Sequence, residues 1–216
     1  MTRVTYKAHP PIKQMVGILI NASYPTTAYK GFLQKYLAFQ PTLARANFAG
    51  YSYPDVSSTA ALLLIPNSGD LESANATLKP LWDYVSSIGG NIQTRAEVFP
   101  SYFSLWSYVG ASNASASILG SRLVPSSFFE SPDKVDALAE AFSNQQKAGI
   151  IMHLGTLSSG VARVLMVSLS LLVAGGKVSK VAGDATAVHP SWRRALHHIV
   201  LTAGWDSGTP LPVQNT

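Results

Sequence analysis

The 216-residue sequence contains no cysteine at all. Disulfides, thiol catalysis and thiolate metal sites are therefore excluded together. The N-terminal stretch MTRVTYKAHPPIKQ also lacks the apolar core of a signal peptide. It predicts a cytoplasmic protein if the natural chain begins there, and it leaves secretion open if the chain is part of a longer one.

Charged residues are also scarce, at 12% of the chain, while 47% of the residues are hydrophobic. Typical soluble domains carry about 25% charged residues. We therefore expect the chain to bury much of its surface, in a core, in a homo-oligomer or against a further domain. The net charge of +5 is scattered, and its densest point is Arg193-Arg194. A nucleic-acid-binding face needs a clustered basic surface, so we expect no nucleic-acid partner.

The longest apolar run, GVARVLMVSLSLLVAGG at 160–176, is interrupted by Arg163. A transmembrane helix needs roughly 20 apolar residues. The run therefore predicts a buried strand or helix, and no membrane partner is expected.

Several catalytic motifs are missing from the sequence as well. No GxGxxG follows a predicted strand, no GxSxG is present, and no two of the five histidines have HxH or HxxxH spacing. These absences argue against a nucleotide-binding loop, a serine hydrolase and a histidine metal site.

Short runs rich in β-branched and aromatic residues alternate with segments of helical spacing. The predicted helices cover residues 26–40, 69–90 and 131–145, and 100–109 is a short aromatic helix or loop. The predicted strands are 4–8, 14–22, 46–54, 59–66, 91–99, 115–125, 148–155 and 194–205.

Strands in hairpin pairs with helices returning between them indicate an α+β fold. We expect an antiparallel sheet of about six or seven strands, with helices covering one face. Residues 1–205 form one domain in this interpretation, and 206–216 form a loose, polar tail.

Local signals place the helix ends. Ser68 or Asp70 caps the second helix, and Pro80 inside that helix is expected to kink it or break it in two. Ser131 is expected to cap the helix at 131–145, with Pro132 in its first position.

The last predicted strand, RALHHIVLTAGW, carries the first candidate site. Strand alternation places Arg194, Leu196, His198, Val200 and Thr202 on one face, and His197 and Ile199 on the other. This first face is either a solvated surface or the floor of a ligand pocket. The predicted substrate-binding residues are Arg194, His198, Val200 and Thr202, with Arg122 and His153 on neighbouring strands.

Arg122 lies within an apolar strand, where it needs an anion or another partner unless it reaches solvent. The aromatic stretch YFSLWSY at 102–108 is either a core helix or the lip of a pocket. No catalytic, cofactor-binding or metal-binding residue is predicted.

Two segments, GSRLVPSSFF and GGKVSKVAGDATAVHPSWRRALHHIV, resemble the substrate-binding domain of fungal FAD-linked oxidoreductases. These proteins are the berberine-bridge-enzyme-like members of the vanillyl-alcohol-oxidase (VAO) superfamily, and the resemblance extends over nearly the whole chain. It implies a truncated arrangement, without the family's FAD-binding domain and C-terminal return segment.

The resemblance also implies a function. The full-length family uses FAD, whereas no cofactor is predicted for this chain alone. The chain is expected to form the substrate-binding portion of an oxidoreductase that transfers hydride from a small secondary metabolite to flavin. Val200 stands where several plant relatives carry a Glu or Gln near the flavin. Whether this chain alone is an enzyme is left open.

Two alternatives accompany this interpretation. One is a cofactor-free binding protein, cyclase or isomerase that reuses the same pocket, since confinement of a reactive conformer can itself accelerate a reaction. The other is a non-functional truncated product.

Overall fold

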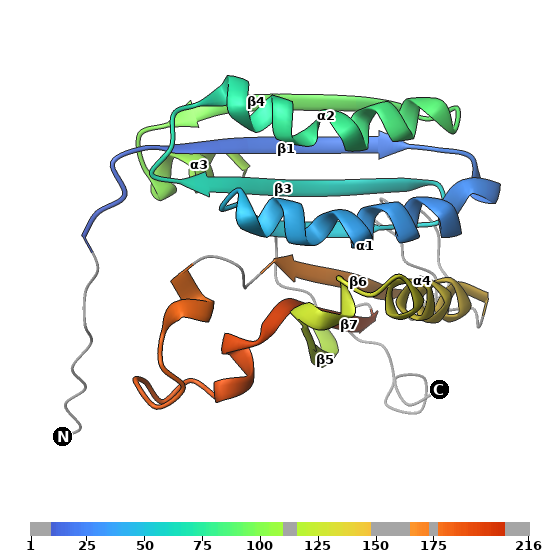
Figure 1. Ribbon diagram of the computed structural model, residues 1–216. Coiled ribbons are helices and arrows are strands. Elements are labelled where there is room, and N and C mark those ends of the chain that lie inside the picture. The colour runs from blue at the N-terminus through green and yellow to red at the C-terminus, as the bar shows by residue number, and fades with distance from the viewer. Residues whose placement is uncertain (1–9, 110–115, 148–164, 173–176, 206–216) are drawn as a thin grey trace.

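The computed structural model describes residues 10–109, 116–147, 165–172 and 177–205. Within these ranges seven strands form one sheet in the order β4-β1-β3-β2-β6-β7-β5, and every neighbouring pair is antiparallel (Figure 1). The strands are β1 (Met15–Ser23), β2 (Ala49–Pro54), β3 (Ser58–Pro66), β4 (Asn91–Phe99), β5 (Ala116–Pro125), β6 (Leu165–Leu172) and β7 (Ala195–Trp205).

Four α-helices accompany the sheet, and short 3₁₀ turns complete the described elements. Helices α1 and α2 lie in front of the sheet in Figure 1, whereas α3 lies behind it. The α-helices are α1 (Tyr29–Arg45), α2 (Leu71–Ser87), α3 (Tyr102–Val109) and α4 (Pro132–Lys147), and the 3₁₀ turns are η1 (Thr26–Ala28), η2 (Ser126–Phe128), η3 (Lys177–Lys180) and η4 (Pro190–Arg193).

The main hydrophobic core lies between the sheet and helices α1, α2 and α4. Alternate residues of β1 point into it, namely Val16, Ile18 and Ile20, and Phe32 of α1 and Leu78 of α2 pack against them. Burial of such apolar side chains is the dominant favourable contribution to folding. Helix α4 is joined to α1 by an ion pair between Lys30 and Glu140, and by a hydrogen bond at 2.9 Å from the Gln34 amide to Asp136.

Helix α3 packs on the opposite face of the sheet, over a second and smaller cluster. Its residue Leu105 is buried together with Met15, Leu64 and Phe99. Gly17 of β1 allows this approach, because a Cβ at that position would lie 2.8 Å from both Leu105 Cδ1 and Phe99 Cε2. The rest of this face of β1, β2 and β3 has no helix packed on it among the described residues.

The predicted α+β class with an antiparallel sheet is confirmed. The prediction that helices cover one face holds for α1, α2 and α4 but not for α3, which packs on the other face. The hairpin expected between 46–54 and 59–66 is formed by β2 and β3. The apolar run at 160–176 contributes strand β6, which pairs with β2 and β7. The strands predicted at 4–8 and 148–155 lie outside the described residues.

Two helix predictions need correction. Helix α1 continues beyond residue 40 and through Pro41 to Arg45. Pro80 does not break α2, which runs as one element to Ser87, because Leu78 and Leu81 on either side of the proline are buried in the core. Packing of this kind outweighs the one backbone hydrogen bond that proline removes.

The N-cap of α2 is Asp70, whose carboxylate accepts a hydrogen bond from the Ser73 amide at 2.8 Å. Ser68 supports the same turn by accepting a hydrogen bond from the Asp70 amide at 3.2 Å. Of the two capping residues that the sequence allowed, Asp70 is therefore the one used. The predicted first position of the third long helix is also confirmed, since α4 begins at Pro132.

Candidate functional site

An aromatic pocket of about 410 Å³ lies on the face of the sheet opposite α1 and α2. Strands β1, β2 and β3 form its floor, and α3 forms one wall. We call it the aromatic pocket, and its lining residues are Leu19, Ile20, Asn21, Tyr51, Tyr53, Ala60, Ala61, Leu62, Leu64, Tyr102, Leu105, Trp106 and Val109.

Strand alternation explains why two tyrosines meet in this pocket. Tyr51 pairs with Leu62, and Tyr53 pairs with Ala60, so both rings lie on the face of β2 that is turned away from α1 and α2. On α3, Leu105 is buried against the sheet, while Tyr102 and Trp106 remain 47% and 45% exposed. The two α3 rings stack with their centroids 6.3 Å apart. This arrangement matches the pocket-lip alternative for residues 102–108 and not the core-helix alternative.

The chemistry of the aromatic pocket suits an apolar or aromatic ligand. Its described lining residues carry no charged side chain, and the polar groups among them are phenols and one amide, Asn21. Burial, and to a lesser extent the neighbouring Tyr51, raises the pKa of Tyr53 above its ordinary value. Tyr53 therefore keeps its proton at neutral pH and can donate a hydrogen bond. The pocket is equipped to bind and orient a ligand, and it lacks a carboxylate that would act as a general base.

The predicted site residues on and beside β7 do not form one cluster. Arg194 precedes the strand as the C-cap of η4 and is exposed. His198 is half-buried against the Trp192 ring, with centroids 5.1 Å apart, and Val200 is buried. Thr202 lies in β7 opposite Val167 of β6, and His153 lies outside the described residues.

Arg122 lies on the other face of the sheet from His198 and Val200. It pairs with Ile199, whereas Ser121 pairs with Val200 and Leu123 with His198. Arg122 and Arg194 nevertheless both line a second hollow at the edge of the sheet.

The start of β7 departs from simple alternation. The pairing with β5 shifts between Val124, opposite His197, and Pro125, opposite Ala195, so Leu196 is an extra residue in a β-bulge. As a result Leu196 and His197 are both buried, although the sequence predicted opposite faces and a more polar setting for Leu196.

Sequence reasoning did not find the pairing of His197 with Gln40 of α1. The His197 Nε2 lies 2.9 Å from Gln40 Oε1, and the Gln40 amide donates to the Tyr36 carbonyl at 3.1 Å. Since Gln40 Oε1 must then accept, His197 carries its proton on Nε2. Burial lowers the pKa of His197 to about 3, so the ring is neutral at physiological pH. The sequence contains no local signal for this contact, because 157 residues separate the two partners.

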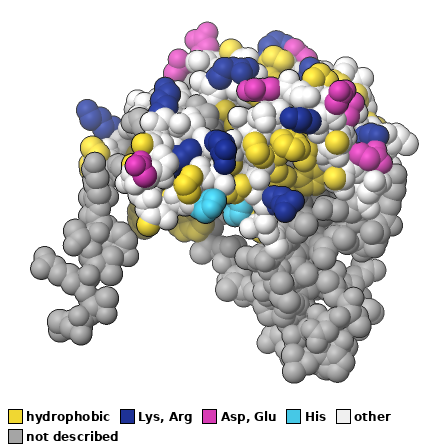
Figure 2. All heavy atoms as spheres, turned by 60° about the horizontal axis from the view of Figure 1, so that its bottom comes forward, with side chains coloured by type: hydrophobic (Ala, Val, Ile, Leu, Met, Phe, Trp, Pro, Cys, Tyr) yellow, Lys and Arg dark blue, Asp and Glu magenta, His cyan; other side chains and the backbone are white. Residues whose placement is uncertain are grey.

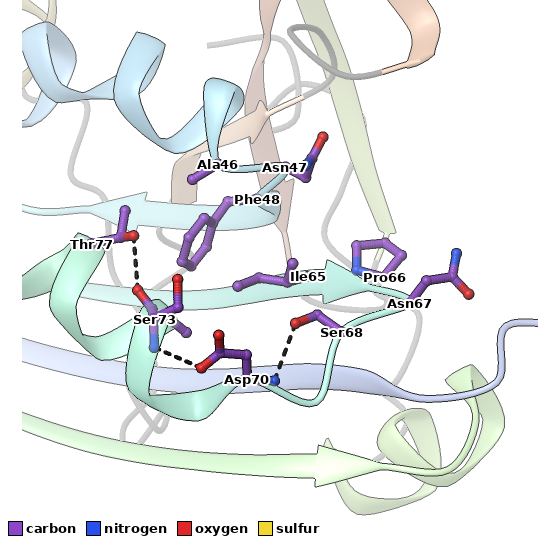
Figure 3. Close-up of a pocket in the computed structure, with 11 residues that line it drawn as sticks. Ala46, Asn47, Phe48, Ile65, Pro66, Asn67, Ser68, Asp70, Ser73 and Thr77 are labelled. Carbon is purple, nitrogen blue, oxygen red and sulfur yellow. Dashed lines mark hydrogen bonds between the residues drawn. The ribbon is translucent and has the colours of Figure 1, made fainter.

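A third hollow, of about 220 Å³, lies between the end of α1, the end of β3 and the start of α2 (Figure 3). Its polar groups largely satisfy one another. Asp70 caps α2 through Ser73, and the Thr77 hydroxyl donates to the Ser73 carbonyl at 2.9 Å. These contacts explain the hollow as part of the turn that starts α2.

Within the described ranges no three His, Cys, Asp or Glu side chains are grouped so that they could hold a metal ion. In the same residues no helix is both long and apolar enough to cross a membrane.

The sequence is similar to one curated fungal protein, an uncharacterized FAD-linked oxidoreductase of Arthroderma benhamiae. The two are 27% identical over 222 residues, which cover 95% of this chain and 35% of that protein. The chain thus spans about a third of the length of this relative. No family model matches the sequence.

The fold is similar to that of solved flavoproteins. Two VAO-type flavoproteins of Myceliophthora thermophila align with TM-scores of 0.68 and 0.67, at 17% and 19% identity. The alignments cover 90% and 97% of this chain, and 33% and 37% of the two flavoproteins. The chain therefore has the fold of one part of a VAO-type flavoprotein, and the resemblance to fungal FAD-linked oxidoreductases that its sequence indicated is confirmed.

Proposed function

We propose that this chain is the substrate-binding portion of an FAD-dependent oxidoreductase that acts on a small, largely apolar secondary metabolite. The observation that carries the proposal is the aromatic pocket on the face of the sheet that also carries α3. The similarity to an FAD-linked oxidoreductase supports the reaction class. In this role the chain holds and orients the substrate, and bound FAD supplies the acceptor for the hydride.

The aromatic pocket supports binding of a flat, uncharged molecule. Tyr51, Tyr53, Tyr102 and Trp106 present aromatic rings around a floor of aliphatic side chains. Aromatic side chains combine a large apolar contact area with specific stacking geometry. Pockets of this size, with few polar groups placed among apolar ones, are typical of small-molecule sites.

The aromatic pocket does not suit the whole FAD molecule. Its described lining could face a flavin ring, but it offers no Arg or Lys for the pyrophosphate. We therefore assign the dinucleotide to a further domain or chain, which would cover the face of the sheet that carries the aromatic pocket.

The purified chain is expected not to bind FAD on its own. The test is to titrate it with FAD and to follow flavin fluorescence and the heat of binding. We expect no stoichiometric binding in the aromatic pocket at micromolar concentration, because its lining offers no basic side chain to the phosphates. A colourless preparation agrees with this expectation. Stoichiometric binding that Trp106→Ala weakens would show that the aromatic pocket holds the dinucleotide, and the assignment of FAD to a further domain or chain would be wrong.

The aromatic pocket is expected to bind a neutral aromatic alcohol, and Trp106→Ala is expected to weaken that binding about 10-fold. This factor corresponds to about 1.4 kcal/mol, a typical contribution of one stacked ring. The probe is 4-methoxybenzyl alcohol, and binding is followed by titration calorimetry.

Trp82→Ala is the matched control. Trp82 lies on α2 and packs against the main core, away from the aromatic pocket. Equal losses for both variants, or no saturable binding by the parent chain, would contradict the assignment of the aromatic pocket. Conversion of the probe by the flavin-free chain would instead favour the cofactor-free enzyme.

A further inference from the structure

A broad hollow of about 910 Å³ lies at the edge of the sheet beside β5, where η2 and η4 come together. We call it the arginine pocket, because three arginines line it. In Figure 2 the Lys and Arg side chains are spread over the visible face, and some of them lie close to histidines. The lining residues are Ser121, Arg122, Leu123, Pro125, Ser126, Ser127, His189, Ser191, Arg193, Arg194 and Ala195.

No carboxylate of the described residues neutralises these arginines. The described ion pairs are Lys30–Glu140, Lys79–Asp83 and Arg95–Glu97, all elsewhere on the surface. The nearest acidic residues along the chain, Glu130 and Asp184, do not line the arginine pocket.

Arg193 has a hydrogen-bond donor that no protein group in the described ranges satisfies. One of its terminal nitrogens donates to the Thr186 hydroxyl at 2.8 Å, but its Nε is buried without a hydrogen-bond partner. Leaving a buried donor unpaired costs free energy, more so when the group is charged. Arg122 and Arg194 are exposed, so their guanidinium groups can turn towards a ligand in the hollow.

The remaining polar groups of the lining can also donate hydrogen bonds to a ligand. Hydroxyls come from Ser121, Ser126, Ser127 and Ser191. The His189 Nδ1 accepts a hydrogen bond from the Ser191 amide at 3.2 Å, so the neutral His189 ring carries its hydrogen on Nε2. Positive charge combined with hydroxyl donors and no acidic lining residue selects for an oxyanion.

We propose that the arginine pocket binds the phosphate group of a small molecule. Guanidinium groups bind phosphate oxygens in a bidentate manner. A phosphate group with two negative charges also reduces the repulsion among three neighbouring arginines more than a singly charged anion would. The hollow is much larger than a phosphate ion, so it also has room for the organic part of the ligand.

This site is separate from the aromatic pocket, and the proposal does not depend on the proposed function. In the sheet, β5 lies three strands from β2, which corresponds to about 14 Å at the usual strand spacing. Three arginines line one hollow, and a concave site of this kind favours a small molecule, whereas a nucleic acid needs a basic stripe.

The test is to titrate the purified chain with pyrophosphate and with inorganic phosphate by calorimetry, in about 0.15 M salt, which screens exposed charges more than about 8 Å apart. We expect saturable binding of both ions, and at least a 10-fold loss of affinity in the double variant Arg122→Gln, Arg194→Gln. Both side chains are exposed, so the variant is expected to unfold at the same denaturant concentration as the parent chain. Arg193 is left unchanged because its bond to Thr186 supports the local structure.

The matched control is the double variant Arg45→Gln, Lys79→Gln, which removes the same charge from exposed positions away from the arginine pocket. This control variant should bind both ions with an affinity within about twofold of that of the parent chain, since exposed charges outside the arginine pocket act weakly on the ligand when salt screens them. Equal losses in both double variants would indicate general charge attraction and overturn the proposal. Absence of saturable binding, or tighter binding of acetate than of phosphate, would overturn it as well.

Discussion

Acidification is expected to destabilise the protein through His197 over the range from about pH 6.5 to about pH 3. Burial lowers the pKa of His197 to about 3 in the folded chain, whereas the ordinary value is 6.5. Between these limits the unfolded chain binds a proton that the folded chain does not. The stabilisation is therefore complete above pH 6.5 and is lost as the pH falls.

The size of this effect follows from one proton taken up on unfolding. The free energy of unfolding should fall by about 1.4 kcal/mol per pH unit from this group, or roughly 3 kcal/mol between pH 6.5 and pH 4. Denaturant unfolding measured at several pH values gives the slope. The slope gives the number of protons taken up on unfolding, and this number should be lower by one in His197→Leu than in the parent chain.

The Gln40→Leu variant separates the effect of the hydrogen bond to His197 from the effect of burying its ring. It removes the hydrogen bond to Nε2 but leaves the ring buried under Phe129, whose centroid lies 4.8 Å away. Because burial causes the lowered pKa, the slope should persist in this variant even though its stability at pH 7 falls. Loss of the slope in Gln40→Leu would contradict burial as the cause.

Gly50→Ala is expected to destabilise the protein by about 3 kcal/mol or more, or to prevent folding. Gly50 has a φ of 142°, and a Cβ there would lie 2.0 Å from the carbonyl oxygen of Leu62. Its strand also joins the two halves of the sheet, since β2 pairs with β6 through Gly50–Ser52. The substitution therefore combines backbone strain with an overlap that only movement of the β2–β3 pair can relieve.

Gly120→Ala provides the control. Gly120 lies on β5, at the edge of the sheet, and nothing lies within 4 Å of a Cβ placed there. The free energy of unfolding of the Gly120→Ala variant should differ from that of the parent chain by no more than about 0.5 kcal/mol in the same denaturant titration. Similar effects of the two substitutions would show that strain at Gly50 is not the cause.

Much of the secondary structure could be predicted because its signals are local. The spacing of Phe32, Leu33 and Tyr36 marks the buried side of α1. The start of α4 is indicated by Pro132 and the residues next to it. The hairpin of β2 and β3 was equally clear, because turn residues separate two strand-like runs. The ends of helices were less predictable, since packing of Leu78 and Leu81 carries α2 through Pro80.

The candidate sites were only partly visible in the sequence. The sequence predicts Arg122 and Arg194 as site residues, and both line one hollow. That hollow lies at the edge of the sheet, and not on the face that carries His198 and Val200. The β-bulge at Leu196 changed which residues of β7 face the core. A bulge depends on pairing with β5, so alternation along a single strand cannot reveal it.

The sequence by itself determined the class of the fold, the positions of most helices and strands, and the resemblance to FAD-linked oxidoreductases, because periodicity, capping residues and motifs act over a few neighbouring positions. Only the tertiary structure decided which distant residues share a site. Tyr51 and Trp106 meet because α3 packs on the sheet over Gly17, and His197 is neutral because its strand is buried beneath α1. Such encounters depend on strand order and packing between segments far apart in the chain, which no local pattern specifies.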